Sequence, residues 1–522
     1  MKPLIIIGAG PVGLTMALAC QFYNIPFRLF EKNNSLSYDT KAGTTLTRSL
    51  EAFRRFGVSE GVLSRALRVE EIGDIELATN QNRNPVQLKL LSDETRFPFV
   101  INLPQHHLEP ALAEGLSNDQ TSNVNFNWRF EKFEKNINGI SVQFQTPEGV
   151  RHIEGSYLLA CDGGHSNVRE QLDIPIVGKS LDVKYALVDI DVDLDIKNPR
   201  NYPYLSYFFD PQEWVIAVRQ PHFWRFIFPC CEDQTELTKV DLIAKVEHFI
   251  GETTDLSILN STTYKVHHRI ASTWREDRVF LMGDAAHLIT PMWALGMNSG
   301  ILDAINLSWR FAWLMRGWAN DTILDGYERE LKPLATYGTG EMAESARALM
   351  ENKNQKMESD KWSEWRTAMT RTLLGIKLDV EASGDFSVVK KDSGKIQLGE
   401  RFPDVEVHLA SGILSRTHDL FDDSFVALYF TDARRKLSLP SDLQGLRNIM
   451  VSRWDAPLQS EIRHRSILDV GDRLFEKLGI PPNTIILVRP DDHVAAILPM
   501  TDGIVARTYN TLTGMSHVTS AT

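Results

Sequence analysis

Three glycines near the start of the chain have the spacing of a dinucleotide-binding loop. Residues 8–13 read GAGPVG, which places Gly8, Gly10 and Gly13 in the pattern G-x-G-x-x-G, with Val12 inside it. In that pattern the first glycine permits a tight turn, the second lets the backbone approach a pyrophosphate, and the third lets the next helix pack closely on a strand. We expect these residues, Val12 included, to contact a phosphate-bearing ligand.

The segments around the loop support this prediction. Apolar residues at 4–7 are typical of a strand buried on both faces, and an apolar helical pattern runs from residue 14 to about residue 22. A second apolar strand at 27–30 ends on Glu31, which Lys32 follows. The helix N-terminus offers N–H groups and a positive dipole end to phosphates, and the acidic residue can accept hydrogen bonds from ribose hydroxyls. An adenine dinucleotide site is therefore predicted, and the alternative is a chance Gly-rich turn.

Polar residues also stand at the ends of later predicted strands, where ligand-facing groups gather in open α/β sheets. Gln105 lies where a strand passes into a helix, and Asp162 and Asp284 lie at the ends of apolar strands. A glycine-bearing loop then precedes a helix predicted over 301–318. The strand-end residues are Gln105, Asp162, Gly163 and Asp284, and the loop contains Gly296, Met297 and Asn298.

Charged residues follow the first unit closely. Lys41 and Arg48 belong to a loop and amphipathic helix at 41–57, so both could reach the phosphates of a dinucleotide. The alternative is that they are solvated helix charges. Asp39 lies just before them in a polar loop and by itself would be a turn residue. His287, close behind the later Gly-Asp pair, is predicted to be a structural hydrogen-bonding group.

The composition is that of an ordinary globular protein. Its length of 522 residues predicts two or three domains. Of these residues 43% are apolar and 24% are charged, as in ordinary globular proteins. The net charge of −12 argues against nucleic acid or an anionic membrane as a partner. The four cysteines suit a reducing cytoplasm, and no metal-ligand spacing occurs among Cys and His. No signal peptide or membrane span is predicted.

The rest of the chain suggests two further units. Residues 175–268 are rich in aromatic and β-branched residues and predict an antiparallel sheet, and strand-like segments also occur within about 70–103. Such a sheet beside a dinucleotide domain could roof an apolar ligand, although core packing is the default explanation for any single aromatic. Residues 382–395 are polar and predict a linker, and 396–522 alternate strands and helices in a small α/β domain without cysteine.

Three separated motifs together resemble one enzyme family. The GAGPVG loop with Glu31, the segment CDGGHSNVR at 161–169 and the segment RVFLMGDAAHLITPMWALGMNSGILDAINL at 278–307 closely resemble the single-component FAD-dependent aromatic hydroxylases. These are flavoprotein monooxygenases related to p-hydroxybenzoate hydroxylase and phenol hydroxylase. The segments LGERFP at 398–403 and LVRPDDHVA at 487–495 look like the thioredoxin-like C-terminal domain of the phenol hydroxylase branch.

The resemblance implies an α/β architecture with a Rossmann-like FAD-binding domain, an inserted antiparallel-sheet substrate domain and a thioredoxin-like domain. The FAD-binding domain would be discontinuous, over 1–174 and 269–330. The substrate domain would span 175–268 and take in about 70–103. A helical segment and linker would occupy 331–395, and the thioredoxin-like domain, without redox cysteines, 396–522.

The resemblance also implies roles for single residues. Gly8, Gly10 and Gly13 would hold the ADP half of FAD, with Glu31 on the adenosine ribose. The other implied contacts are Lys41 and Arg48 at family arginine positions, Gln105 on FAD, Asp162 and Gly163 on FAD and the nicotinamide donor, Asp284 on the ribityl and pyrophosphate region, and Pro291, Gly296, Met297 and Asn298 around the isoalloxazine ring. This loop departs from the family pattern at Thr290 and at Trp293, which either lines the substrate pocket or packs in the core.

The implied reaction is hydroxylation of a small phenolic or related aromatic or heteroaromatic substrate. NADPH or NADH would reduce FAD, dioxygen would add to give a C4a-hydroperoxyflavin, and this would transfer oxygen to the ring. Asp39 falls near the position of the family's general base, with a plain loop carboxylate as the alternative; Tyr207 and Arg225 are weaker candidates for substrate binding. A homodimer is suggested by analogy only.

Three alternatives stay open at this point. The W-x-W-x-I-P signature of flavin-dependent halogenases does not occur in the sequence. An FAD oxidase or dehydrogenase would share the fold without hydroxylating. A non-catalytic flavin-fold binding protein would also share it, although the intact glycines and acidic residues argue against such a loss.

Overall fold

The computed structural model describes most of the chain. The described residues are 2–38, 42–82, 85–117, 123–209, 214–231, 238–289, 294–338, 370, 372–375, 377–380, 395–421, 423–431, 439–453 and 465–515. Four predicted site residues, Asp39, Lys41, Pro291 and Trp293, lie outside the described residues, as does most of the segment 331–395.

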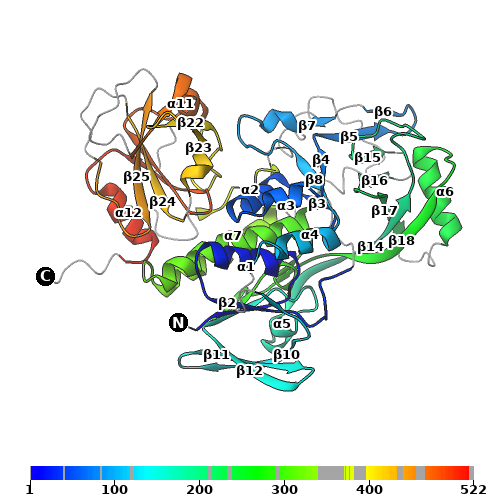
Figure 1. Ribbon diagram of the computed structural model, residues 1–522, viewed down its shortest axis with the longest axis horizontal. Helices are drawn as coiled ribbons and strands as arrows, with labels where there is room; N and C mark the ends of the chain where they lie inside the picture. The colour runs from blue at the N-terminus through cyan, green and yellow to red at the C-terminus, as the bar shows by residue number, and fades with distance from the viewer. Residues whose placement is uncertain are drawn as a thin grey trace.

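A mainly parallel sheet of six strands forms the centre of the molecule (Figure 1). β1 (Leu4–Ile7) pairs in parallel with β2 (Phe27–Phe30) on one side and β13 (Tyr157–Ala160) on the other. All four residues of β1 are buried, as the β-branched run predicts for a strand covered on both faces. The sheet is completed by β20 (Val279–Leu281), β19 (Arg275–Glu276) and β9 (Val124–Asn125).

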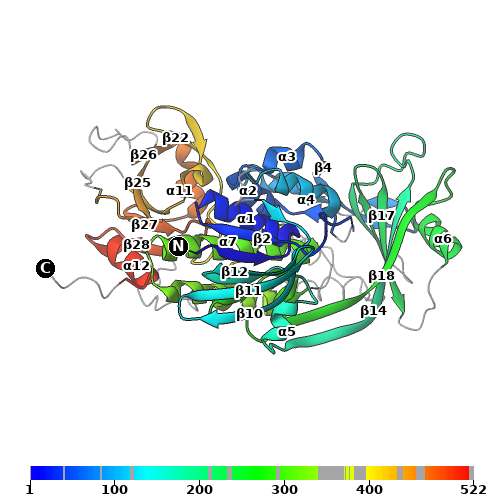
Figure 2. The same ribbon diagram turned by 60° about the horizontal axis from the view of Figure 1, so that its bottom comes forward.

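Two helices that pack on each other connect this sheet to the rest of the fold. α1 (Pro11–Phe22) follows the Gly-rich loop, and α7 (Leu295–Met315) runs along it through the middle of the molecule (Figure 2). α7 is buried along most of its length, which fits its nearly continuous apolar sequence. A small antiparallel sheet of β10 (Arg129–Asn136), β11 (Gly139–Thr146) and β12 (Gly149–Gly155) lies at the edge of this unit.

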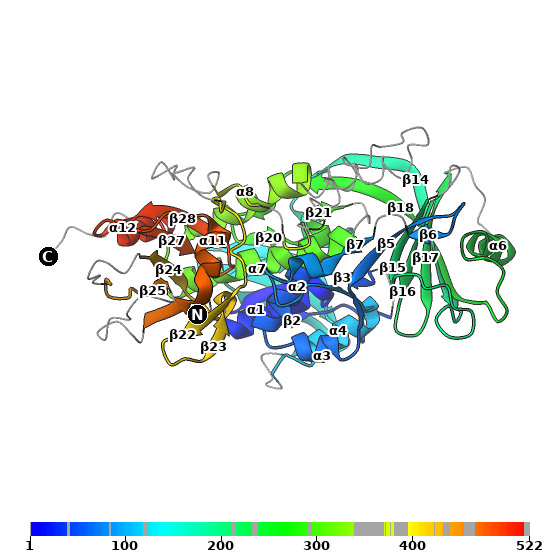
Figure 3. The same ribbon diagram turned by 90° about the horizontal axis from the view of Figure 1, so that it is seen from above.

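A larger, mainly antiparallel sheet lies at one end of the molecule (Figure 3). Alternate residues of its strands face two separate apolar clusters: Tyr207 and Trp214 face one, and Phe208 and Val215 the other. Helix α6 (Lys239–Ile250) covers the second cluster. The strands are β14 (Ile176–Asp191), β15 (Leu205–Phe209), β16 (Trp214–Arg219), β17 (Trp224–Cys231), β18 (Ser257–Ala271), β21 (His287–Leu288), β5 (Glu71–Glu76), β6 (Gln81–Asn82) and β7 (Val86–Gln87).

Short elements join the two sheets. β3 (Thr44–Thr45), β8 (Val100–Asn102) and β4 (Leu67–Val69) form a small sheet, and helices α2 (Thr47–Arg55), α3 (Ser59–Leu63) and α4 (Gln105–Ala113) lie beside it. Asn102 ties these parts together: its side chain accepts from the Thr44 hydroxyl (2.9 Å) and donates to the carbonyls of Tyr204 and Arg219.

The C-terminal domain is built on a seven-stranded sheet at the other end of the molecule (Figure 1). Its centre, β24 (Phe425–Phe430), pairs in parallel with β25 (Leu446–Arg453) and antiparallel with β27 (Thr484–Val488). The other elements are β22 (Glu406–Leu409), β23 (Leu414–Arg416), β26 (Ser466–Asp469), β28 (Val494–Pro499), α11 (Arg473–Leu478) and α12 (Ile504–Leu512).

The α/β class and the first strand, helix and strand are confirmed, while the thioredoxin-like assignment stays a prediction. The start of α7 was placed wrongly: the helix begins at Leu295 rather than at residue 301. Ala294 adopts a left-handed conformation (φ 56°) and so turns the chain directly into the helix. Gly296, Met297 and Asn298 therefore belong to its first turn and not to a loop. None of the helices in the described part of the chain combines the length and apolar character that a membrane crossing needs.

Candidate cofactor and active site

Two glycines of the loop are required by backbone packing. A Cβ on Gly8, whose φ is +99°, would lie 2.3 Å from the carbonyl oxygen of Cys161. A Cβ on Gly13 would lie 1.9 Å from the carbonyl oxygen of Gly8. The loop, the first turn of α1 and the end of β13 therefore touch through their backbones, as the motif predicts.

Gly10 has a different environment. A Cβ on Gly10 would meet nothing within 4 Å among the described residues. Gly10 is the N-cap of α1, and no side chain of the described residues caps that helix end. The N-terminal amides and the positive dipole end of α1 thus face open space. This is the arrangement that accepts a pyrophosphate.

Glu31 organises the loop from the end of β2. Its carboxylate accepts hydrogen bonds from the amides of Ala9 and Asn33, both at 3.0 Å. The residue is half-buried and Lys32 beside it is exposed. A carboxylate has about four acceptor sites, so Glu31 keeps capacity for hydroxyl donors of a ligand.

Asp162 has a buried acceptor without a hydrogen-bond partner among the described residues. One carboxylate oxygen accepts from the Val168 amide at 3.3 Å, whereas the other is buried and has no hydrogen-bond partner among the described residues. Burial raises the pKa of this carboxyl, because it disfavours the charged form. Gly163 follows with φ +84°. A buried orphan oxygen beside a Gly-rich loop suits the sugar or polyol hydroxyls of a dinucleotide.

Val12 links the loop to the second motif. A Cβ on Gly283 would lie 2.9 Å from the Val12 side chain, and one on Gly300 of α7 would lie 2.6 Å from it. Val12 thus sits between the turn at 283–284 and α7, which is a packing role. Asp284, in the same turn, is exposed.

Beneath this turn lies a buried ion pair. Asp303 of α7 accepts a hydrogen bond from the Gly283 amide at 2.7 Å, and the same oxygen lies 2.8 Å from His287 Nε2. Burial alone would lower the pKa of His287, but the charge and hydrogen bond of Asp303, with the charge of Asp284, outweigh it and raise the pKa. The structural role predicted for His287 fits this geometry.

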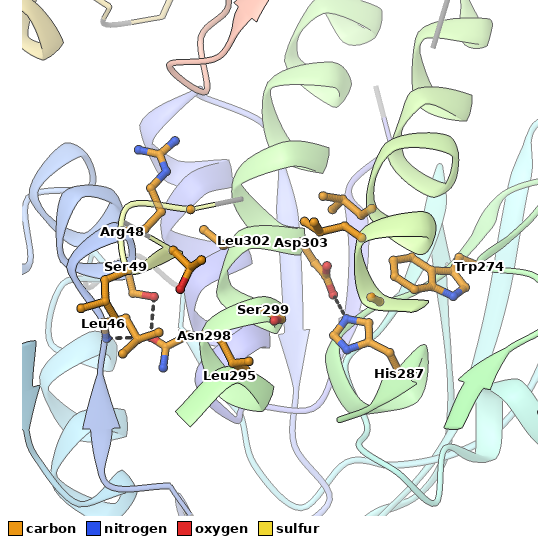
Figure 4. Close-up of a pocket in the computed structure, with 16 residues that line it drawn as sticks. Leu46, Arg48, Ser49, Trp274, His287, Leu295, Asn298, Ser299, Leu302 and Asp303 are labelled. Atoms are coloured by element: carbon orange, nitrogen blue, oxygen red, sulfur yellow. Dashed lines mark hydrogen bonds and ion pairs between the residues drawn. The ribbon is translucent and has the colours of Figure 1, made fainter. Parts of the chain in front are cut away.

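Asn298 joins α7 to α2 (Figure 4). Its carbonyl oxygen accepts from the Leu46 amide (2.9 Å) and from the Ser49 hydroxyl (2.7 Å). Its amide nitrogen donates to the carbonyls of Thr44 and Ala294. Since the side chain is fully engaged within the protein, the group that the first turn of α7 can offer a flavin is backbone rather than the Asn298 amide.

Gln105 and Arg48, both predicted to contact the cofactor, lie in different surroundings. Gln105, the first residue of α4, donates to Glu109 at 2.7 Å and lies 3.5 Å from the Ala42 amide, so it adjoins the segment that follows residues 39–41. Arg48 is buried, and its guanidinium binds Glu51 and Asp492. The structure thus places the Arg48 guanidinium at the boundary with the C-terminal domain instead of at a pyrophosphate.

The predicted substrate residues lie on the large sheet. Tyr207 belongs to the apolar cluster that also contains Tyr185, Trp214 and Leu295 of α7. Arg225 is buried and forms a two-point ion pair with Asp189, at 2.8 and 3.0 Å. Its guanidinium also lies against Gly43, because a Cβ there would come within 3.4 Å of it. Both residues therefore lie on the side of the sheet nearest α2 and α7.

A cavity lies beside α7, and residues of α2 and of the segment 331–335 also line it (Figure 4). Its free volume is about 40 Å³, which holds a few water molecules and is well below that of a small-molecule site. Leu46, Leu295 and Leu373 line it and also belong to the aromatic cluster of the sheet, so the cavity adjoins that cluster.

Sequence reasoning missed two residues that shape the site. Asp303 was one, although a single carboxylate in the apolar helix pattern after His287 was an available signal. Arg169 was the other: it donates to the carbonyls of Ala285 (3.0 Å) and Gly164 (2.8 Å) and so connects the two acidic motifs. Its place inside the segment 161–169 was known, but nothing local indicated its partner. Among the described residues, no group of three or more His, Cys, Asp or Glu side chains is arranged to hold a metal ion.

The FAD binding domain family matches residues 1–339 of the chain, and the chain belongs to this family. One curated relative is the 3-(3-hydroxy-phenyl)propionate/3-hydroxycinnamic acid hydroxylase of Escherichia coli O81 (strain ED1a), 30% identical over 334 residues. The same hydroxylase of Shigella sonnei (strain Ss046) is equally similar. These matches cover 62% of the chain and 58% of each relative, so the chain spans less than two thirds of their length.

Solved flavoenzyme structures share the fold over nearly the whole chain. The flavin-dependent monooxygenase PieE, determined with FAD and substrate, superposes with a TM-score of 0.77 at 19% identity and covers 99% of this chain and 98% of its own. Aklavinone-11 hydroxylase, determined with FAD and aklavinone, also reaches 0.77, at 21% identity, with 98% and 99% covered. The shared fold includes the C-terminal domain.

Proposed function

We propose that this chain is an FAD-dependent monooxygenase that hydroxylates a small phenolic or related aromatic compound. The observation that carries the proposal is one buried acceptor without a protein partner and an open backbone position beside the same Gly-rich loop. Gly10 leaves room at the α1 N-terminus, and Asp162 presents a buried oxygen without a protein partner among the described residues. The family match over residues 1–339 and the hydroxylase relatives support the same reading.

The residues fit FAD in an extended pose. The α1 N-terminus would hold the pyrophosphate, Glu31 the adenosine ribose, and Asp162 and Asp284 the sugar and ribityl hydroxyls. The backbone at Gly296 and Met297, in the first turn of α7, would face the flavin ring, since the Asn298 side chain is occupied. Bound FAD would supply the redox chemistry, with electrons from NADPH or NADH and oxygen from dioxygen.

The protein would orient the substrate and exclude water. The aromatic cluster with Tyr207 would offer an apolar surface for a ring, next to the start of α7. Removing water protects a reactive oxidant, and a fixed ring brings the reacting carbon within attack distance. The charge of Arg225 is already paired with Asp189, so Arg225 would hold neighbouring strands together rather than bind an anionic substrate.

Oxygenated product formation tests the proposal directly. We expect purified protein to be yellow, and NADPH or NADH oxidation to accelerate when a phenol is added, with product mass raised by one oxygen. The compounds to screen are simple phenols, hydroxyphenyl acids and polycyclic phenols. The names of the 30% identical relatives suggest the acids, and the aromatic cluster suggests ring compounds in general. Flavin bleaching without oxygenated product would indicate an oxidase or dehydrogenase instead. Colourless folded protein that refuses FAD would contradict the proposal altogether.

Asp39 is proposed as the base that deprotonates the phenol. Replacing Asp39 by Ala is expected to slow hydroxylation about 100-fold at neutral pH, because general base catalysis contributes at least this much. FAD should stay bound. The rate of the variant should recover as the pH approaches the pKa of the free phenol. Stopped-flow measurement of hydroxylation across a pH series would show this. Asp502→Ala, which removes an exposed carboxylate of the C-terminal domain, is the control, and equal rates for both variants would remove Asp39 from the mechanism.

The remaining details are part of the same proposal. A thioredoxin-like C-terminal domain would have no dithiol chemistry, because all four cysteines precede residue 232. A homodimer is proposed by analogy alone.

A further inference from the structure

One turn of the C-terminal domain contacts two separate parts of the FAD-binding unit. We call residues 489–493 the bracket turn. It is closed by hydrogen bonds from the Arg489 amide to the His493 carbonyl (2.8 Å) and from the Asp492 amide to the Arg489 carbonyl (3.0 Å). Asp492 has a left-handed backbone (φ 65°), which aspartate tolerates better than most residues. The turn therefore has a defined shape of its own.

The first contact is with helix α2. Arg48, in its first turn, donates to Asp492 at 2.9 Å and to the Asp491 carbonyl at 2.6 Å. Arg55, at its last residue, binds the other oxygen of Asp492. Because one carboxylate holds both ends of the helix, the turn fixes the direction of α2 as well as its distance.

The second contact is with α7 and α8 (Gly326–Pro333). Arg489 donates to Glu330 of α8 at 2.7 Å, and its guanidinium lies 5.3 Å from the centre of the Trp309 ring of α7. The same Glu330 oxygen lies 2.7 Å from Arg310 of α7. The bracket turn thus reaches α7 through the Trp309 ring and through Glu330 of α8.

These contacts close a ring around the candidate site. α2 and α7 are joined at their N-terminal ends by Asn298, and their facing side chains line the cavity (Figure 4). Away from that joint, the bracket turn also connects the two helices, in addition to the apolar core that they share. The first turn of α7, which the proposed function places at the flavin ring, is held at the Asn298 joint together with the segment 42–46.

The bracket turn is an unusual way to stabilise an interface. Arg48, Asp492, Arg489 and Glu330 are each at most 4% exposed. Burying ion pairs costs much of what their attraction returns, and a well-packed apolar contact is often at least as stable. In some proteins buried ion pairs favour one defined geometry, because another arrangement leaves a charge unpaired.

We propose that the bracket turn is a positioning device for the flavin site, with Asp492 as its central residue: it sets the spacing of α2 and α7 and so the placement of residues 42–46 and 294–298. The C-terminal domain is then a part of the active-site scaffold rather than a separate module. The consequence for the flavin rests on the proposed function, whereas the spacing of the helices does not.

The test is Asp492→Asn in the full-length protein, because asparagine keeps the shape and tolerates the left-handed backbone while removing the charge. Asp419→Asn is the matched control. Asp419 also binds an arginine of α2, Arg54, at 2.7 Å, but it is part-exposed, and its other ion pair is with Arg96 rather than with a residue of the bracket turn. Thermal unfolding should show how far each variant is destabilised.

Two readouts separate positioning from stability. In the protein without FAD, hydrogen exchange at the Leu46 amide, which donates to Asn298, is expected to be about tenfold faster in Asp492→Asn than in Asp419→Asn at equal distance below each melting temperature. With FAD added, the visible circular dichroism of the bound flavin is expected to change only in Asp492→Asn, with about tenfold weaker FAD binding.

The outcomes are distinct. Unchanged Leu46 exchange in Asp492→Asn overturns the bracket proposal, whether or not the protein binds flavin. Faster exchange with unaltered flavin dichroism and affinity overturns its link to the cofactor. Wild-type protein that binds no FAD contradicts the proposed function. The exchange measurement still tests whether the bracket turn sets the spacing of α2 and α7.

Discussion

Replacing Gly10 by Ala is expected to leave the protein folded and largely free of FAD. The new Cβ meets nothing within 4 Å of the described protein, and the backbone at this residue (φ −72°, ψ −177°) suits alanine. The same Cβ would occupy the space at the α1 N-terminus where a pyrophosphate must approach the amides. We expect FAD affinity to fall about 100-fold, or about 3 kcal/mol. Flavin fluorescence titration of the apoprotein would measure it.

Two other glycines provide the controls. Gly61, in α3, also leaves open space for a Cβ, but it lies outside the Gly-rich loop; Gly61→Ala should bind FAD like the wild type. Gly13→Ala should instead fail to fold stably, because its Cβ would lie 1.9 Å from a backbone oxygen. Equal FAD affinity in Gly10→Ala and Gly61→Ala would place the cofactor elsewhere and remove the main support of the proposed function.

The sequence predicted those features whose causes are local. The Gly-rich loop, the strand before it and the helix after it depend on neighbouring residues, so their pattern is visible in a stretch of about 30 residues. The start of α7 was predicted wrongly because no Ser, Thr, Asp or Asn precedes Leu295 as a capping signal. A left-handed turn at Ala294 begins the helix instead, without a side-chain cap, and it has no clear sequence signature.

Residues whose partners are distant were the hardest to interpret. Arg48 was a candidate phosphate contact because it follows the dinucleotide unit in the chain, with a solvated helix charge as the alternative. Its ion-pair partner, Asp492, stands 444 positions further on. Amphipathic periodicity shows that a helix has a polar face but not what that face meets. The acceptor left open on Asp162 was equally invisible, since it depends on the absence of a partner in three dimensions.

Replacing Asp303 by Ala is expected to destabilise the protein by about 3–5 kcal/mol, the usual cost of removing one partner of a buried ion pair. Two groups lose their acceptor at once: the Gly283 amide and the imidazole of His287. The turn at 283–284, which carries Asp284, would lose its support from α7, so FAD binding should fall as well. Urea unfolding of the apoprotein separates the first effect from the second.

The pH dependence of stability provides the decisive check on this ion pair. The pKa of His287 is raised in the folded protein, so the pair contributes fully below the unfolded value of about 6.5 and its contribution is lost as pH rises through the folded pKa. Asp303→Ala should abolish that alkaline loss. His287→Gln keeps a hydrogen-bond donor but cannot titrate, so it should also flatten the profile while costing less stability than Asp303→Ala. A wild-type stability that does not decline from pH 6 to 9 relative to His287→Gln would show that His287 is neutral in the folded protein and that Asp303 acts through the Gly283 amide alone.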